Sequence, residues 1–132
     1  MNGSPELKVV IDTNVIFMAF YNPNNKAGQI ISHANSSKIK LFSPDTVKEE
    51  INRVLKKELS LTDNEIKNMI ESLPIIWVEK EIYEKELPNT KVKHKPDKPI
   101  EALARIIGCD ILSADTDFKN RLNINKLLEK LK

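Results

Sequence analysis

The chain has 132 residues, the size of one ordinary domain, and 40% of them are hydrophobic, as in folded globular proteins rather than disordered ones. Its 21 Lys and Arg and 19 Asp and Glu give a formal net charge of +2, which is too small to indicate nucleic-acid binding by itself. The single cysteine excludes an internal disulfide and a cysteine-based zinc site, so we expect a reducing compartment. We predict one domain over residues 1–132.

The ends of the sequence and its hydropathy bear on location. Residues 1–6 lack the basic and apolar segments of a signal peptide, and we expect them to form a flexible leader. No apolar stretch approaches the roughly 20 residues that a membrane helix needs. These features predict a soluble, cytoplasmic protein without a membrane association.

In the first half of the chain, strand and helix patterns alternate. The expected elements are a buried strand at 7–11, a helix from residue 14, a helix at 26–36 and a strand at 38–43. Ser43, followed by Pro44 and Asp45, has the pattern of a helix N-cap. We therefore predict a helix that begins at Ser43 and runs to about Leu59.

The second half continues the alternation. Thr62 and Glu65 have the spacing of a capping box, Pro74 ends that helix, and Gly108 ends a later one. The expected elements are a strand at 75–78, a short helix at 79–87, a loop at 88–99, a helix up to 107, a strand at 111–112 and a helix at 124–131. This order predicts an α/β fold in three layers, with a central parallel sheet of four or five strands and helices on both faces.

Acidic side chains follow two of the predicted strands. Asp12 ends the first strand, and Asp115 and Asp117 follow the strand at 111–112. In open parallel sheets the functional site lies beyond the carboxyl ends of the strands, so we expect these acids at one edge. Closely spaced carboxylates do not all stay ionised without a counter-charge. The pattern therefore indicates a metal site at the mouth of the sheet.

Two further acids are placed by predicted helices. Glu50 flanks the apolar stripe of the helix after Ser43, whereas Glu49 falls on its solvated face, so Glu50 is the better candidate. Asp97 precedes the helix that begins near Pro99. It could act as an N-cap, for which Asp is a preferred residue, or reach a metal at the sheet mouth. Both interpretations stay open for Asp97.

The ligand chemistry of these acids indicates the ion and the reaction. Oxygen ligands without histidine or thiol suit the hard cations Mg²⁺ and Mn²⁺, which activate water and neutralise charge on a phosphate. The implied reaction is phosphodiester hydrolysis. Beside Asp97, the basic stretch 91–98 is either ordinary solvated surface or a contact for the phosphate backbone, through Lys93, Lys95 and Lys98.

Four short motifs, each weak alone, occur in a fixed order. A strand runs into Asp12-Thr13-Asn14, and a helical Glu50-Ile51 follows. Asp97 then precedes a helix that reads Pro-Ile-Glu-Ala-Leu-Ala, and the last strand runs into Ser113-Ala114-Asp115-Thr116-Asp117-Phe118. In this order the motifs resemble those of the PIN-domain ribonucleases, which include the VapC toxins of toxin–antitoxin pairs. The resemblance spans residues 7 to about 123.

The resemblance carries further expectations. It implies a doubly wound sheet, and Mg²⁺ or Mn²⁺ held by Asp12, Glu50, Asp97, Asp115 and, in many members, Asp117. It implies that Asn14 and Ser113 orient ligands or phosphate, and Ser113 keeps the hydroxyl of the Thr that is usual there. The short segment after Phe118 implies a reduced or absent last edge strand. The implied partners are RNA, an antitoxin protein and a second copy of the chain in a homodimer.

We therefore expect a Mg²⁺- or Mn²⁺-dependent endoribonuclease, with the toxin of a type II toxin–antitoxin pair as the favoured role. An RNA-maturation nuclease without an antitoxin shares the same motifs and stays open. A non-cleaving RNA-binding module is disfavoured, because a pure binder gains nothing from clustered negative charge near phosphate. A haloacid-dehalogenase phosphatase needs a second acid where Asn14 stands, and a receiver domain would lack Glu50.

Overall fold

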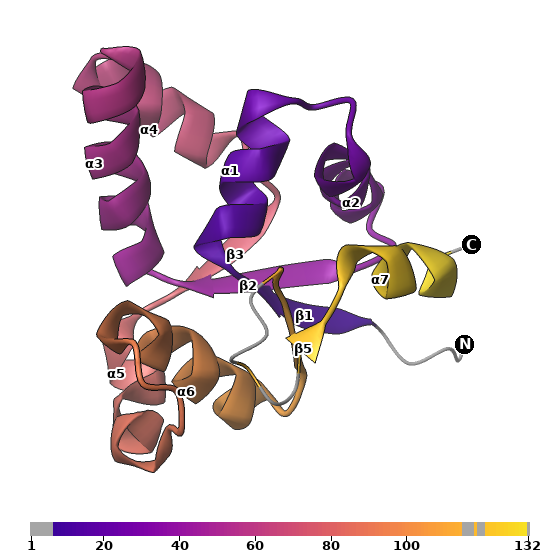
Figure 1. The fold of residues 1–132 in the computed structure, drawn as a ribbon, viewed down its shortest axis with the longest axis vertical. Coiled ribbons are helices and arrows are strands. Elements are labelled where there is room, and N and C mark those ends of the chain that lie inside the picture. Colours follow the sequence, from indigo (N-terminus) through magenta and orange to yellow (C-terminus); the bar gives the residue numbers. More distant parts are fainter. Residues whose placement is uncertain (1–6, 115–117, 119–120, 132) are drawn as a thin grey trace.

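A five-stranded parallel sheet forms the centre of the computed structural model, which describes residues 7–114, 118 and 121–131. The strands are β1 (Lys8–Ile11), β2 (Lys40–Pro44), β3 (Ile75–Val78), β4 (Asp110–Leu112) and β5 (Arg121–Leu122). Their order is β3-β2-β1-β4-β5, and every pairing is parallel (Figure 1). The predicted α/β fold is confirmed. The last edge strand is present but reduced to two residues.

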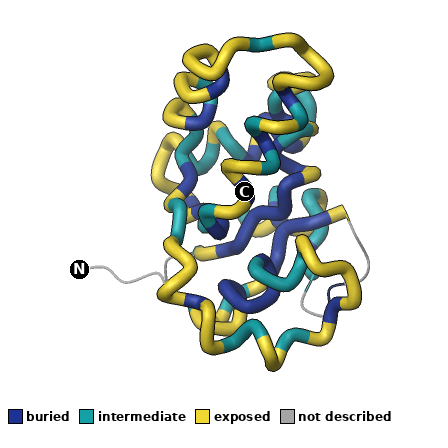
Figure 2. Tube along the Cα trace, turned by 90° about the vertical axis from the view of Figure 1, so that its left-hand side faces the viewer, coloured by how far each residue is buried: buried dark blue, intermediate teal, exposed yellow. Residues whose placement is uncertain are grey.

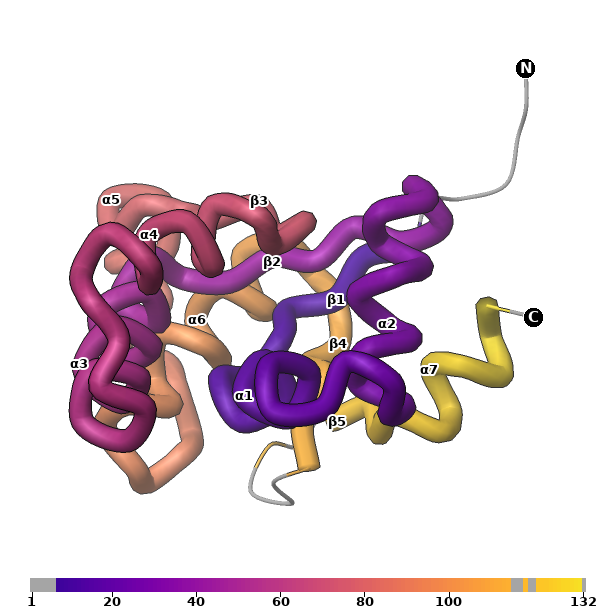
Figure 3. Tube along the Cα trace, turned by 90° about the horizontal axis from the view of Figure 1, so that it is seen from above, coloured from indigo at the N-terminus to yellow at the C-terminus, as the bar shows by residue number. Residues whose placement is uncertain are grey.

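Helices cover both faces of this sheet. They are α1 (Thr13–Tyr21), α2 (Lys26–Asn35), α3 (Thr46–Leu59), α4 (Asp63–Glu71), α5 (Lys80–Tyr83), α6 (Lys98–Ile107) and α7 (Ile124–Lys130), with 3-10 turns η1 (Glu84–Asn89) and η2 (Lys95–Asp97). Helix α6 packs on β1, β2 and β4 from one side, and α1 and α2 lie on the other (Figure 1). Seen from above, α3 and α4 lie together at one end of the molecule, and α2 and α7 at the other (Figure 3). None of the helices in the described ranges is long and apolar enough to cross a membrane.

Several predicted helix ends are confirmed. The Thr62 hydroxyl accepts a hydrogen bond from the Glu65 amide at 3.1 Å, and the Glu65 carboxylate accepts one from the Thr62 amide at 3.0 Å, which is the predicted capping box. Gly108 ends α6 in the left-handed conformation with φ of 77°. The sequence predicted these helix ends because each depends only on residues within one turn of the chain.

The predicted helix start at Ser43 is wrong. Strand β2 continues through Pro44, and α3 begins at Thr46. Ser43 lies opposite Trp77 in the parallel register, and its buried hydroxyl donates to the Ile11 carbonyl at 3.5 Å. Pairing with β3 therefore outweighed the local capping signal. The predicted helix at 79–87 is likewise divided into α5 and η1, and the predicted loop at 88–99 contains η2.

The core lies between the sheet and its covering helices. Buried segments run through the interior of the trace, and exposed segments lie mainly around it (Figure 2). Buried aliphatic side chains from the strands meet those of α1, α3 and α6, including Ile16, Ile51 and Leu103. Five polar or charged residues in the described part of the chain are buried with them: Asp12, Thr13, Ser43, Glu101 and Ser113. Buried polar groups need hydrogen-bond partners, so the positions of these five side chains are constrained by the groups around them.

A pH-dependent loss of stability is expected from Tyr83. Its buried hydroxyl donates to Asp45 Oδ1 at 3.2 Å, and burial and the Asp45 charge raise the pKa of Tyr83 from 10.0 to about 12. Because the folded state holds this proton more tightly, the free energy of unfolding should fall as the pH rises from about 10 to about 12. Urea unfolding of wild type and Tyr83→Phe across this range measures the effect. An equal pH slope in both proteins would contradict it.

Candidate active site

The sheet topology creates a crevice where β1 and β4 end. The chain leaves β1 toward β2 and β3 but leaves β4 toward β5 on the opposite side, so the order reverses between these two strands. Such a reversal point is where open α/β sheets place their ligands, outside the carboxyl ends of the strands. Asp12 follows β1 and Ser113 follows β4.

Asp12 and Ser113 are in direct contact at this crevice. The Ser113 hydroxyl donates to Asp12 Oδ2 at 2.6 Å, and the Asp12 amide donates to the Leu112 carbonyl at 2.9 Å. Asp12 is 4% exposed and Ser113 is 0% exposed. A short hydrogen bond to a buried carboxylate fixes the carboxylate's orientation and stabilises its charge. The structure thus brings together two residues that the sequence indicated separately.

A hollow of about 530 Å³ adjoins this crevice. Its lining combines the start of α1, one side of α3, η2 and the first turn of α6: Thr13, Thr46, Val47, Glu49, Glu50, Arg53, Lys95, Pro96 and Pro99. Glu50 and Lys95 therefore lie on the hollow itself. Asp12 precedes its residue Thr13, and Asp97 lies between its residues Pro96 and Pro99. Three segments distant in sequence, around residues 13, 46–53 and 95–99, meet here.

The two adjacent glutamates of α3 differ in exposure, but both border the hollow. Glu50 is half-buried and Glu49 is exposed, as their positions on the helix predicted. Glu49 is therefore on the solvated face, as predicted, and both side chains line the hollow. Glu49 and Arg53 also line a second hollow between α3 and α4. Glu49 therefore lies at the boundary between the two hollows.

Asp97 occupies the position before α6 without acting as its side-chain cap. Within the described residues its carboxylate makes no capping hydrogen bond to the α6 amides. The side chain is 15% exposed, and its Oδ2 lies 3.5 Å from Nδ1 of His94. His94 adds a positive charge there only when its imidazole is protonated. The structure therefore does not show the side-chain cap that the sequence offered as one interpretation, and metal binding by Asp97 stays a prediction.

The remaining predicted residues have different surroundings. Asn14, Lys93 and Lys95 are exposed, the first of them in the first turn of α1. Lys98 is half-buried, and its ammonium donates to the Val92 carbonyl at 3.0 Å and to Thr90 Oγ1 at 3.4 Å. Much of the hydrogen-bonding capacity of Lys98 is therefore directed to the protein. Contact of these residues with phosphate stays a prediction.

Glu101, which the sequence patterns did not single out, and Arg121, a basic residue after the last predicted acids, hold segments next to the candidate site. Glu101 is a buried carboxylate on α6 that accepts from the amides of Lys91 and Val92. Arg121 on β5 donates to the Ser113 carbonyl at 3.0 Å, tying the edge strand to the residue beside Asp12. The signal for Glu101 was present, as one charged residue in the apolar stretch 100–104.

The metal site itself stays a prediction. Asp115 and Asp117 lie outside the described residues. Within the described ranges, no three His, Cys, Asp or Glu side chains are close enough together to hold a metal ion. The acids that border the hollow are carboxylates from separate elements, without thiol ligands, and this donor chemistry fits a hard cation.

Removing the Ser113 hydroxyl should weaken the site more than the fold. Ser113→Ala takes the donor from Asp12, and loss of a partner that orients a metal ligand typically lowers metal affinity or activity about tenfold or more. Ser113→Thr keeps a hydroxyl and serves as the matched control. Mn²⁺ titration by calorimetry measures the change. Equal Mn²⁺ affinity in Ser113→Ala and wild type would contradict the role given to this hydrogen bond.

A comparison with protein families identifies the family to which this fold belongs. The family model described as PIN domain matches residues 9–117, from β1 through the last predicted acid. The chain belongs to the PIN-domain family. PIN domains are generally nucleases that depend on divalent metals. The match ends before β5, the last strand of the sheet, and α7, the last helix. A search of curated proteins finds no match to this PIN domain.

Proposed function

We propose that this PIN domain is a Mg²⁺- or Mn²⁺-dependent endoribonuclease that hydrolyses phosphodiester bonds in RNA. The observation that carries the proposal is the buried Asp12–Ser113 pair at the strand-order reversal, beside a hollow lined by Glu50 and Lys95. Family membership supports nuclease chemistry. The carboxylates favour a cation, and the neighbouring lysines favour a polyanion.

The residues divide between holding the ion and holding the substrate. The proposed ligands are Asp12, Glu50, Asp97, Asp115 and Asp117. When bound, a divalent ion supplies an activated water and neutralises charge on the scissile phosphate. Ser113 orients Asp12, while Lys95 and Arg53 on the lining of the hollow are available to phosphate. The exposed Asn14 and Lys93 are proposed to assist in positioning the RNA.

The adjacent glutamates of α3 provide a matched test of this assignment. Glu50→Gln should lower kcat/KM for a fluorescent single-stranded RNA by about 100-fold, as expected for a lost group that stabilises transition-state charge. Glu49→Gln should stay within about threefold of wild type, because its exposed carboxylate is screened by solvent. Cleavage should require added Mn²⁺ or Mg²⁺ and stop with EDTA.

The same assay can reject the proposal. Wild-type cleavage that persists in EDTA would exclude the metal-dependent mechanism. Equal losses in Glu49→Gln and Glu50→Gln would exclude Glu50 as the ligand supplied by α3. Absence of cleavage of any RNA by metal-loaded wild type, with DNA cleaved instead, would replace the substrate class.

For the biological role we propose a toxin of a type II toxin–antitoxin pair, acting on RNA in the cytoplasm. The support is the resemblance of the four motifs to those of VapC toxins. Induced expression of wild type should arrest bacterial growth, and expression of Asp12→Asn should not. Arrest that is relieved by the product of a neighbouring gene would identify the antitoxin. Normal growth with active nuclease would favour RNA maturation instead.

We also propose that the chain forms a homodimer through α1. The support is an exposed surface on that helix, where Met18 and Tyr21 are both exposed and the Phe17 and Tyr21 rings stack with centroids 6.1 Å apart. Exposed apolar surface of this kind is typical of interfaces. Light scattering after size exclusion should give twice the chain mass of 15.1 kDa. Met18→Glu should shift it to the monomer, whereas Ile106→Glu, on exposed α6 surface, should not.

A further inference from the structure

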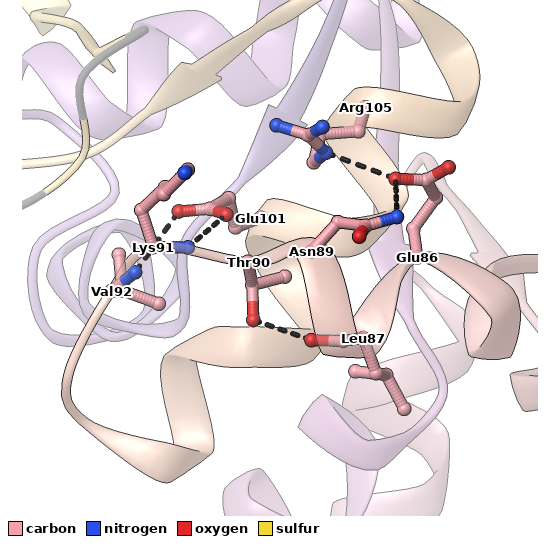
Figure 4. A network of polar contacts seen from close by, with 8 residues as sticks. All are labelled: Glu86, Leu87, Asn89, Thr90, Lys91, Val92, Glu101 and Arg105. Atoms are coloured by element: carbon pink, nitrogen blue, oxygen red, sulfur yellow. Dashed lines mark hydrogen bonds and ion pairs between the residues drawn. The ribbon is translucent and has the colours of Figure 1, made fainter.

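Glu101 is a buried acid that no step of the proposed reaction uses. It lies on α6 within the run 100–104, in which every residue is buried, and it is 7% exposed. A carboxylate in such a place is costly unless its oxygens are hydrogen-bonded. Both oxygens are occupied here: Oε2 accepts from the Lys91 amide at 2.6 Å and Oε1 from the Val92 amide at 3.2 Å (Figure 4).

The segment that Glu101 binds is held to α6 from a second side. The Lys98 ammonium, less than one turn before Glu101, donates to the Val92 carbonyl and to the Thr90 hydroxyl. Val92 itself is buried in the core. The stretch 90–92 is thus fixed by a carboxylate on its amides, an ammonium on its carbonyl and a packed side chain. This is a dense set of contacts for a connection outside the sheet.

This anchored stretch leads directly into the hollow. Only two residues, Lys93 and His94, separate Val92 from η2, the turn Lys95–Asp97. Lys95 lines the hollow together with Glu50, and Asp97 ends the turn at the start of α6. Two extended residues span about 7 Å, so η2 cannot move far while Val92 stays in place.

We propose that Glu101 is a positioning residue, which holds residues 90–92 against α6 and thereby sets the location of Lys95 and Asp97 at the hollow. The inference rests on the proposed function, because that function assigns phosphate binding to Lys95 and metal binding to Asp97. It goes beyond that function because it assigns the placement of Lys95 and Asp97 to Glu101, a carboxylate outside the proposed set of metal ligands and phosphate contacts.

Glu101→Gln tests the anchor with little change of shape. The amide of Gln can accept from one of the two backbone amides but presents its own N–H groups to the other. Hydrogen exchange measured by NMR should become about tenfold faster for Lys91, Val92 or both, as expected for one lost charge-assisted hydrogen bond. KM for RNA should rise about tenfold with kcat within about threefold, and Mn²⁺ affinity should fall about tenfold.

Glu86 provides the matched control on the same side of α6. Its half-buried carboxylate accepts from Arg105 Nε at 3.0 Å and from the Asn89 side chain at 3.3 Å, so it also ties η1 to α6 (Figure 4). Those contacts involve side chains outside the anchored stretch. Glu86→Gln should therefore leave KM, Mn²⁺ affinity and the exchange of Lys91 and Val92 as in wild type.

A second variant separates positioning from stability and covers the case in which Glu101→Gln does not fold. Insertion of two glycines between Lys93 and His94 leaves the anchor intact but loosens its connection to Lys95. It should raise KM for RNA about as much as Glu101→Gln, with wild-type exchange at Lys91 and Val92. Wild-type KM in the insertion variant would overturn the proposal.

The remaining outcomes are also decisive. Faster exchange in Glu101→Gln with wild-type KM and Mn²⁺ affinity would show that Glu101 supports the fold alone and would overturn the proposal. Unchanged exchange would overturn the anchor itself. If wild type cleaves no RNA, the proposed function fails, and the exchange and Mn²⁺ titrations still decide whether Glu101 positions Asp97.

Discussion

Asp12→Asn is expected to lower kcat/KM for RNA cleavage by about 1,000-fold while the protein stays folded. A metal held by this carboxylate supplies several kcal/mol of charge stabilisation in the transition state, and about 4 kcal/mol corresponds to that factor. Asn keeps an oxygen that can accept from the Ser113 hydroxyl, so the buried hydrogen bond survives. Initial rates at saturating Mn²⁺ and the melting temperature of each variant measure both effects.

Asp110→Asn is the control for this substitution. Asp110 begins β4 and is exposed, and it lies at the opposite end of the strand from Ser113. Its loss of charge should leave cleavage within about twofold, since exposed charges in water interact weakly. If Asp12→Asn combined with Asp115→Asn leaves Mn²⁺-dependent cleavage unchanged, the proposed mechanism is wrong. Equal losses in Asp12→Asn and Asp110→Asn would point to a general charge effect.

Gly28→Ala is expected to destabilise the fold by about 3 kcal/mol, the upper part of the range for overpacking a buried site. Gly28 is buried in the first turn of α2, where its amide donates to Asn25 Oδ1 at 3.0 Å. A methyl group built there would lie 1.8 Å from the carbonyl oxygen of Pro23 and 2.5 Å from its carbonyl carbon. Both are backbone atoms, so the connection between α1 and α2 would have to move.

Gly108→Ala separates this steric effect from the general consequence of losing a glycine. Gly108 has φ of 77°, and a methyl group placed on its Cα would meet no atom of the described residues within 4 Å beyond its own chain neighbours. The expected destabilisation is about 1 kcal/mol, which is the penalty of a left-handed residue. Urea unfolding of wild type, Gly28→Ala and Gly108→Ala measures their free energies of unfolding. Equal m-values in the three proteins make these free energies comparable. A Gly28→Ala protein as stable as Gly108→Ala would show that the α1–α2 connection yields easily.

Sequence patterns predicted the features that depend on neighbouring residues. The strand that runs into Asp12, the capping box at Thr62 and the glycine end of α6 all have their causes within one turn of the chain. The same is true of Glu50, whose half-buried place follows from the apolar stripe of α3. The fold class followed from the alternation of these local signals.

Features that depend on distant partners were missed. Ser43 had the local pattern of a cap, and only the pairing of β2 with β3 shows that it belongs to a strand. Glu101 was overlooked because its partners are backbone amides ten and nine residues earlier, and amides have no signature in a sequence. The placement of Asp97 without a side-chain cap also needed the structure.

The central position of β1 has a consequence for synthesis of the protein. This strand is made first, yet it pairs with β4, and Val9 lies opposite Asp110 in that pairing. The Asp12–Ser113 contact likewise joins residues 101 positions apart. Such distant pairings form late, because the intervening chain must first be closed into a loop. Assembly of the proposed active site during synthesis therefore requires the chain through β4, because Asp12 and Ser113 must both have been made.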